Sequence, residues 1–405
     1  MTTIDQLEAH GIPITALARG AVADITTVVH DAGQLRSLLD PGLDPPGRQA
    51  HYQALFGGTG PAATGGQAAA TDDGGAALSQ RIAAHVIGDA PLSDEDQAAI
   101  APAFPLTVHV TAAPGPLTVS SRYDLSTPDG SMRIASFTDV TLEQGGYFVC
   151  EATPLTFTCQ TLTRTGTSGG TAADFNILGN TAATPPTPPA PAAAGQATAG
   201  APGECTKPGT AGPGGGNGSP GAPGTPGTAG TNGSPGTPSM PATITIQQTL
   251  TASQLTIYSQ SGPGGQGGNG GAGAPGQQGG NGGNGATCDC TGNAGGNGGN
   301  GGIGGTGGAA GNGGNGADAA GNVVIRVPSQ ADVAKVQYTT QPAPPGAAGQ
   351  PGPGGMGGTG GSAGSGGKNN PNGVPGGSGN PGVTGAQGQP GTISGKAAQI
   401  TVTPV

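Results

Sequence analysis

The five cysteines are the residues whose type and spacing suggest chemistry in this chain, and that chemistry is disulfide formation. Cys150 and Cys159 lie in consecutive strand-like segments, whereas Cys205 interrupts one glycine-rich stretch and Cys288 and Cys290 interrupt the next. If these two interruptions meet, Cys205 can bond to Cys288 or to Cys290. Cys150 can bond to Cys159, which leaves one cysteine over. Disulfides would indicate an oxidising compartment.

The alternatives to disulfides are free thiols or a metal site, and other reactive motifs are weak. The C-x-C pair has neither a second pair nor a nearby histidine to complete a zinc site. The five histidines are scattered through the N-terminal part without metal-ligand spacing. Asp72-Asp73-Gly74-Gly75 predicts a turn, and the one calcium-repeat-like stretch at 313–324 has no stacking neighbour. We therefore predict no catalytic residue, metal, cofactor or enzyme activity.

Composition places the chain outside the usual range for enzymes. Among its 405 residues are 87 glycines and 39 prolines, a share typical of low-complexity or fibrous sequences. Aromatic residues are 3 % and charged residues 8 %, so an ordinary core and ordinary disorder are both disfavoured. The net charge of −10 argues against nucleic acid as a partner, and no apolar run is long enough for a membrane span. The first residues lack the pattern of a secretory signal.

Residues 1–105 predict a small helical or mixed domain for attachment or assembly. Helix-like apolar spacing occurs at residues 4–7, 17–22, 35–39 and 81–87. Ser93 is expected to cap a further helix, because acidic residues follow it in the first turn. A loop at 57–75 interrupts these segments.

From Leu106 the apolar period becomes two, which predicts a β scaffold, either a solenoid or a sandwich. Its first part covers residues 106–183, with strands expected at 106–110, 117–121, 132–137, 140–144, 147–152 and 155–163. Further short strands are expected at 242–248, 254–260, 322–327, 334–340 and 397–405. In residues 184–405 these strands alternate with three glycine-rich loops, at 184–241, 261–321 and 341–396.

The loops repeat in triplets, which matches the three residues per turn of a polyproline-II helix. Each loop has a break near its middle, at residues 204–208, 286–291 and 368–372, rich in turn-forming residues. Three loops with one reversal each predict a bundle of about six polyproline-II or polyglycine-II helices, each of roughly 75 Å. The second loop has two glycines per triplet and therefore two edges without side chains, so we expect it at the centre.

These repeats resemble two known classes. The run GAPGTPGTAGTNGSPG at 221–236 looks like bacterial collagen-like repeats, and GGNGGNGGIGGTGG at 295–308 looks like polyglycine-II bundles. Such bundles occur in adhesins at the tips of some bacteriophage long tail fibres, in the snow-flea antifreeze protein and in the N-terminal domain of the Obg GTPases. GTPase motifs are absent here, and collagen fits poorly where glycine fills two places of three. The chain also departs from the adhesins by its larger β portion and its cysteines.

In the phage adhesins the turns between glycine helices contact the receptor, so the resemblance implies that the three breaks form a contact surface. The candidate contact residues are Glu204, Thr206, Lys207, Thr287, Asp289, Thr291, Lys368, Asn369, Asn370 and Asn372. Partners would be further copies of the chain or a surface receptor, at an extracellular, cell-surface or virion-surface location.

We predict a non-enzymatic structural surface protein, a subunit of an extracellular filament assembled through exposed strands such as the C-terminal one. The alternatives are an adhesin of a phage tail fibre or a cell surface, and an ice-binding protein that uses the small residues of the triplets. A further alternative is that the glycine-rich loops are disordered spacers between the strands.

Overall fold

The computed structural model describes residues 22–40, 42–57, 74–166, 173–392 and 396–405, and it is mainly β. One sheet has seven strands, in the order β1-β2-β4-β6-β10-β14-β16. These are β1 (Ala23–Val29), β2 (Leu106–Val119), β4 (Met132–Leu142), β6 (Leu155–Arg164), β10 (Ala242–Thr251), β14 (Val323–Val327) and β16 (Ile400–Pro404). All neighbours in this sheet are parallel except β1 and β2.

The second sheet contains five parallel strands in the order β15-β11-β7-β5-β3. They are β3 (Arg122–Asp124), β5 (Tyr147–Glu151), β7 (Phe175–Leu178), β11 (Leu255–Gln260) and β15 (Val336–Gln341). Successive passes of the chain from β2 to β15 therefore give one strand to each sheet in turn. Of the two expected scaffolds, this parallel coiling is that of a solenoid rather than a sandwich.

The main core lies between the two sheets. Phe137 and Phe157 come from the seven-stranded sheet, and Phe148 and Phe175 from the other. Their ring centroids lie 4.9–5.5 Å apart and each side chain is at most 2 % exposed. Four of the six phenylalanines in the chain are thus packed together at the place where burial stabilises the fold most.

In two places, two neighbouring segments that were expected as separate strands form one longer strand. The segments at 106–110 and 117–121 form β2, and those at 132–137 and 140–144 form β4. The register of β2 against β4 shifts between Ala113 and Pro116. A bulge of this kind interrupts the alternation in the sequence without ending the strand.

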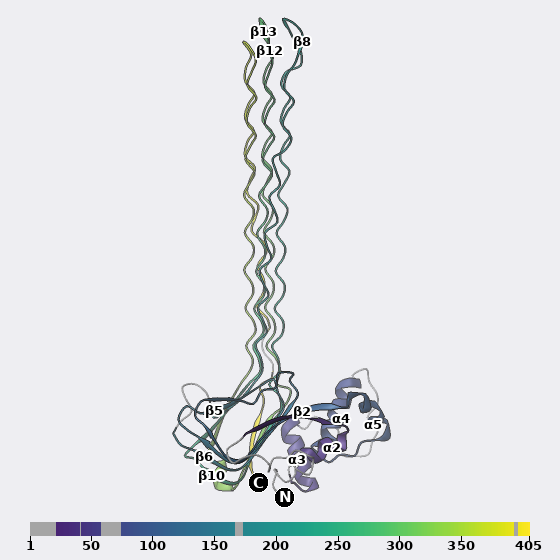
Figure 1. The fold of residues 1–405 in the computed structure, drawn as a ribbon, viewed down its shortest axis with the longest axis vertical. Helices are drawn as coiled ribbons and strands as arrows, with labels where there is room; N and C mark the ends of the chain where they lie inside the picture. The colour runs from purple at the N-terminus through teal and green to yellow at the C-terminus, as the bar shows by residue number, and fades with distance from the viewer. Residues whose placement is uncertain (1–21, 41, 58–73, 167–172, 393–395) are drawn as a thin grey trace.

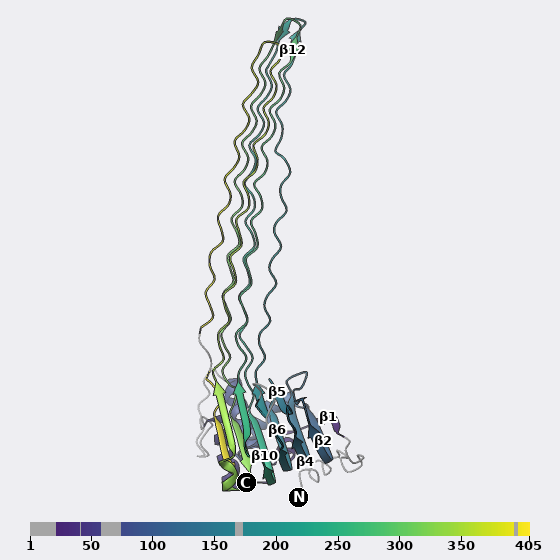
Figure 2. The same ribbon diagram turned by 90° about the vertical axis from the view of Figure 1, so that its left-hand side faces the viewer.

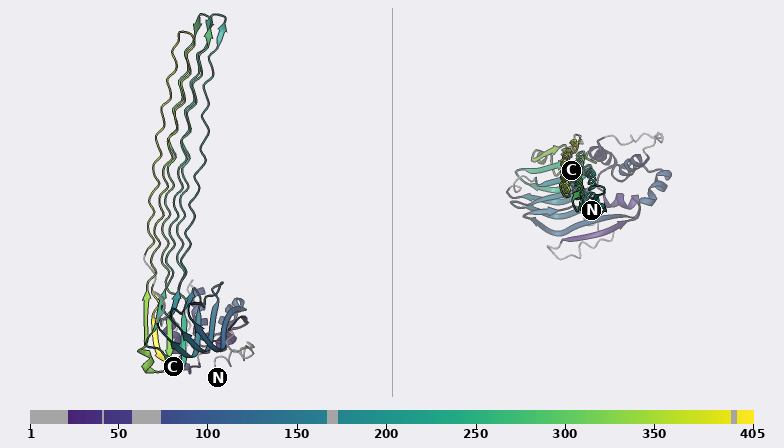
Figure 3. Two further views of the ribbon diagram at one scale, coloured as in Figure 1. Left: turned by 60° about the vertical axis from the view of Figure 1, so that its left-hand side comes forward. Right: turned by 90° about the horizontal axis from the view of Figure 1, so that it is seen from above.

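Helices cover the outer face of the seven-stranded sheet, as Figures 1 and 3 show. They are α2 (Ala32–Leu38), α3 (Pro45–Phe56), α4 (Gly74–Val86), α5 (Asp94–Ile100) and a 3₁₀ turn at Ala101–Ala103. The short α6 (Gln330–Val333) lies elsewhere, and its Val333 packs against the core between the sheets. Ser93 caps α5 as predicted, since its hydroxyl accepts the N–H of Asp96 at 3.1 Å. A second apolar cluster joins these helices to the sheet through Leu35, Val86 and Val110.

The N-terminal residues are joined to the scaffold by strand pairing. β1 was not predicted, and it pairs with β2 along its whole length, from Ala23 opposite Ala112 to Val29 opposite Leu106. The helix candidate at 4–7, all of the candidate at 17–22 except Val22, and most of the loop at 57–75 lie outside the described residues.

Six extended segments rise from one end of the solenoid and lie side by side (Figures 1 and 2). We call them limb 1 (180–204), limb 2 (212–236), limb 3 (262–286), limb 4 (292–317), limb 5 (343–367) and limb 6 (373–392). The loops leave after β7, β11 and β15, which are neighbours in one sheet, and return to β10, β14 and β16, which are neighbours in the other. The three loops therefore start and end at one corner. Among the described helices, none is long and apolar enough to cross a membrane.

Candidate functional site: the far end of the six limbs

Backbone hydrogen bonds at every third residue connect the limbs and so determine where their far ends lie. In limb 3, the N–H groups of every third residue from Gly265 to Gly283 donate to limb 2 at 2.8–2.9 Å, and those from Gly264 to Gly285 donate to limb 5 at 2.7–3.0 Å. Limb 4 donates in the same way to limbs 3 and 6. The two limbs of the second loop thus have most neighbours, which agrees with the central position expected from their paired glycines.

Glycine is required where two limbs approach each other. A Cβ added to Gly299 would overlap the carbonyl oxygen of Ser219 in limb 2, and one added to Gly298 would overlap that of Gly361 in limb 5. Gly195 in limb 1, in contrast, has no atom near enough to meet an added Cβ. The triplet pattern therefore marks the sides of each limb that face a neighbour.

Asparagine side chains add a second set of bonds between limbs. The Oδ1 atoms of Asn284 and Asn300 accept the backbone N–H of Ser365 at 2.9 Å and of Gly377 at 2.9 Å. Others that do the same are Asn217, Asn232, Asn269, Asn281, Asn297, Asn312 and Asn315. Sequence reasoning missed this role, although the recurrence of Asn after two glycines was its signal. These amide oxygens therefore help to hold neighbouring limbs together.

At the far end the three turns meet, and we call residues 204–211, 286–292 and 368–372 together the tip. The first turn holds β8 (Cys205–Lys207) and β9 (Thr210–Ala211), and the second holds β12 (Thr287–Cys288) and β13 (Thr291–Gly292). A disulfide joins Cys205 to Cys288, with their Cα atoms 5.8 Å apart. Of the two pairings left open for Cys205, the structure has the one with Cys288, and Cys290 is an exposed free thiol.

The expected bond between Cys150 and Cys159 is wrong. Cys150 lies in β5 and Cys159 in β6, so the two residues belong to opposite sheets, and both are buried free thiols. Burial raises the pKa of the Cys150 thiol to about 12, and it also raises that of Cys159. Both therefore act as small apolar residues of the core.

Hydrogen bonds between turns link the tip in addition to the disulfide. The hydroxyl of Thr291 donates to the carbonyl of Gly209 at 3.2 Å, which joins the second turn to the first. The third turn is joined through Lys368, whose backbone N–H donates to the hydroxyl of Thr287 at 3.1 Å and whose Nζ donates to the carbonyl of Asp289 at 3.2 Å. All three turns thus belong to one connected structure.

Asn293 lies beneath the tip and is only 8 % exposed. Its Nδ2 donates to the carbonyls of Glu204 and Pro213 at 3.1 and 2.8 Å, and its Oδ1 accepts the N–H of Ala286 at 2.6 Å. It therefore supports the first two turns from below. Sequence reasoning missed this residue, because nothing in the sequence distinguishes it from the other asparagines of the limbs.

The structure brings all ten expected contact residues to the tip. Nine are exposed and Asn370 is half-buried. Asp289 and Asn369 have φ values of 52° and 61°, the left-handed conformation that Asn and Asp tolerate best after glycine. Asn372 has an internal role, because its Oδ1 accepts the N–H of Gly366 at 2.8 Å. The tip carries two acidic residues, Glu204 and Asp289, and two basic ones, Lys207 and Lys368.

Within the described ranges, no group of three or more His, Cys, Asp or Glu side chains is placed to hold a metal ion. Comparison with protein-family models, with curated proteins and with solved structures gave no match.

Proposed function

We propose that the protein is a non-enzymatic surface protein whose six limbs form a polyglycine-II bundle, a stiff stalk that presents the tip to a receptor. The observation that carries this proposal is the meeting of three turns, far apart in sequence, at one end, where a disulfide and hydrogen bonds hold them. A spacer would not need its turns to be fixed to one another.

The stalk gives the tip reach. A limb of about 25 residues in polyglycine-II geometry is roughly 75 Å long at about 3.1 Å per residue. The regular hydrogen bonds of limbs 3 and 4 support a stiff rod, because each central limb is bonded along its length to neighbours on several sides. A stiff rod lowers the entropy that the tip loses when it binds.

The chemistry of the tip favours a polar partner. Most of its exposed side chains are threonines, asparagines and charges of both signs, and the described tip has no exposed large apolar side chain. Such a surface suits a glycan or a polar protein receptor, and the disulfide fits an extracellular, cell-surface or virion-surface location.

Charge reversal at the tip tests this proposal. Glu204→Lys and Lys207→Glu change exposed side chains to which the structure gives no ion pair or side-chain hydrogen bond within the described residues, so the fold is expected to persist. Labelled protein would be applied to a glycan array and to a panel of bacterial and eukaryotic cells. We expect binding that the tip variants lose and that a matched variant near the base, Lys396→Glu, retains. Binding that survives both tip changes would exclude the tip as the contact surface.

Assembly into a filament is a second candidate, and one observation favours it. β15 is the edge strand of the five-stranded sheet, with the uncharged sequence VQYTTQ, and its Tyr338 is 52 % exposed. An uncharged edge strand is a template for strand addition. The C-terminal strand that the sequence suggested, β16, carries Pro404, which cannot donate a backbone hydrogen bond. Electron microscopy of the purified protein would distinguish filaments from single stalks.

A further inference from the structure

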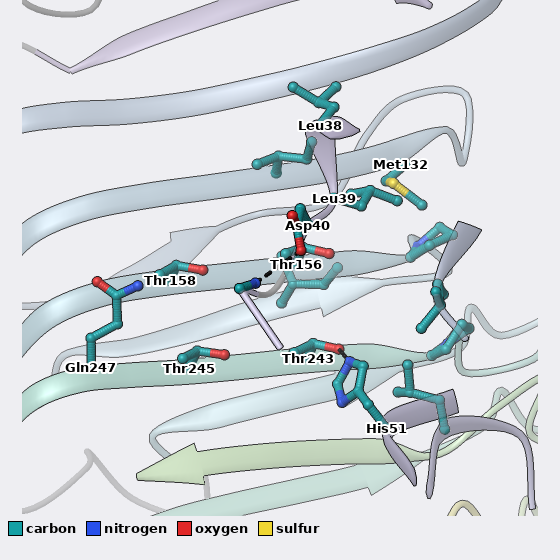
Figure 4. A pocket seen from close by; sticks show the side chains of 17 residues that line it. Leu38, Leu39, Asp40, His51, Met132, Thr156, Thr158, Thr243, Thr245 and Gln247 are labelled. Atoms are coloured by element: carbon teal, nitrogen blue, oxygen red, sulfur yellow. Dashed lines mark hydrogen bonds between the residues drawn. The ribbon is translucent and has the colours of Figure 1, made fainter. Parts of the chain in front are cut away.

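A cavity lies between the helices and the outer face of the seven-stranded sheet, far from the tip. Its volume is about 120 Å³, and it is bounded by α2, α3 and the strands β4, β6 and β10 (Figure 4). It lies outside the core between the sheets, and neither the stalk nor the tip explains it.

One wall of the cavity is a patch of threonines. Thr156 and Thr158 on β6 pair in register with Thr243 and Thr245 on β10. They point outward because the alternate residues of both strands, such as Phe157 and Ile244, fill the core between the sheets. Figure 4 shows the threonine side chains of both strands along the same side of the cavity. Two rows of two hydroxyls therefore face the space.

Three of the four hydroxyls have no hydrogen-bond partner among the residues that the structure describes. Thr243 is bonded to Nε2 of His51 at 3.2 Å. The structure gives no hydrogen bond to the side chains of Thr156, Thr158 or Thr245 among the described residues, although Thr245 is only 7 % exposed. These hydroxyls line the cavity, so each can donate a hydrogen bond to a ligand there or accept one from it.

The rest of the lining is apolar, on the helix side opposite the threonines and on β4 beside them. Leu38 and Leu39 come from the end of α2, Leu55 comes from α3, and Met132 and Ile134 come from β4. A ligand must therefore combine a hydrogen-bonding edge with an apolar body.

The charged groups at the cavity are neutralised. Asp40 accepts hydrogen bonds from Nη1 of Arg48 at 3.2 Å and from the N–H of Gly42 at 3.0 Å. Burial, together with the nearby charges of Arg326 and Arg48, lowers the pKa of His51 to about 4, so its ring is neutral at pH 7. A charged ligand would lose its hydration here without gaining a free counter-charge.

We propose that this cavity binds a small uncharged amphipathic molecule, with its hydroxyl or carbonyl group on the threonines and its apolar body against Leu55 and Ile134. An engineered cavity of about 150 Å³ holds one benzene molecule, so the buried part of the ligand is roughly the size of a single ring or a short alkyl chain. Phenol has these properties and serves as the probe.

The test is a ligand-observed NMR titration of the full chain with phenol, benzene and benzoate. The double variant Thr158→Val/Thr245→Val removes two hydroxyls with little change of shape. Thr163→Val/Thr251→Val is its matched control, because Thr163 and Thr251 pair in register on the same two strands and do not line the cavity. Thermal unfolding of both variants checks that they fold.

We expect phenol to bind, with benzene and benzoate weaker. The cavity variant should lower the affinity for phenol by roughly threefold to tenfold for each hydroxyl lost, and the control variant should leave the affinity unchanged. No binding of phenol would overturn the proposal. Equal binding of benzene or benzoate would overturn it too, as would equal losses in the two double variants.

Discussion

Cys205 and Cys288 lie 83 residues apart in the sequence, yet their Cα atoms are 5.8 Å apart at the far end of the limbs. The bond joins the turn of the first loop to the turn of the second, at the point farthest from the solenoid that holds the other ends of both loops (Figure 1). The two loops are therefore tied at both ends.

Loss of this disulfide should loosen the tip while the base stays ordered. A cross-link that closes a loop of this length is worth about 4 kcal/mol in the chain-entropy model. We expect Cys205→Ser to speed amide hydrogen exchange in residues 200–216 and 283–296, measured by mass spectrometry, with no change in the solenoid strands. Cys290→Ser, at an exposed free thiol, is the control and should have no effect. Similar exchange at the tip in both variants would contradict this role.

A methyl group at a central glycine should disrupt the limbs. In Gly299→Ala the new Cβ would overlap the carbonyl of Ser219, and we expect a loss of about 1–3 kcal/mol. Gly195→Ala adds the same methyl where no atom lies near it and should be tolerated. Circular dichroism during thermal unfolding compares the stability of the two variants, and limited proteolysis compares how readily their limbs are cleaved. Equal tolerance of both changes would mean that limbs 2 and 4 are not packed together.

The asparagine side chains that accept backbone N–H groups of a neighbouring limb, here called the asparagine ladder, should contribute to the attachment of limb 6. Asn300→Ala removes the acceptor of the Gly377 N–H, and the expected cost is about 0.5–1.5 kcal/mol. The effect should appear as faster exchange near residue 377. Gln266→Ala is suited as a control, because Gln266 is exposed on limb 3 and has no side-chain hydrogen bond to another described residue. If both variants exchange like the parent protein, the ladder contributes nothing measurable.

Acid should destabilise the packing of α3 on the sheet through His51. Its pKa falls from 6.5 in the unfolded chain to about 4 in the folded one, so the unfolded state binds the proton first as pH falls. The stability that the neutral ring provides is present in full above pH 6.5 and is lost as pH falls to about 4, which amounts to roughly 3 kcal/mol.

Thermal unfolding between pH 7 and pH 4 measures this loss. His51→Gln should flatten the dependence over that range, whereas His30→Gln, at an exposed histidine, should leave it as steep as in the parent. A slope that is unchanged in His51→Gln would assign the acid sensitivity to other groups.

Much of the architecture could be predicted from the sequence, because the strands and the limbs each have a characteristic repeat of residue types, of two and of three residues. Alternation of two located most of the scaffold strands but missed β1, β3 and β7, and the triplets with their breaks located the limbs and turns. The paired glycines of the second loop indicated its central place, since a residue without Cβ admits a neighbour. The tip residues followed from the turn chemistry of the breaks.

Other features depend on contacts that a sequence period does not encode. The bulge in β2 interrupts the alternation, so this one strand is predicted as two. Alternation shows that Cys150 and Cys159 point inward, but it does not show that they belong to opposite sheets. Asn293 supports the tip only because the turns of two loops meet above it.

Amide hydrogen exchange along the glycine-rich limbs of the full-length chain tests the central claim most directly. Two of every three backbone N–H groups in limb 3 donate a hydrogen bond to a neighbouring limb. In limb 1, by contrast, the structure shows no backbone hydrogen bond donated by residues 184–196. We predict strong protection in residues 262–286 and 292–317 and rapid exchange in 184–196. Exchange at the rate of an unstructured peptide throughout 262–317 would contradict the hydrogen-bonded stalk.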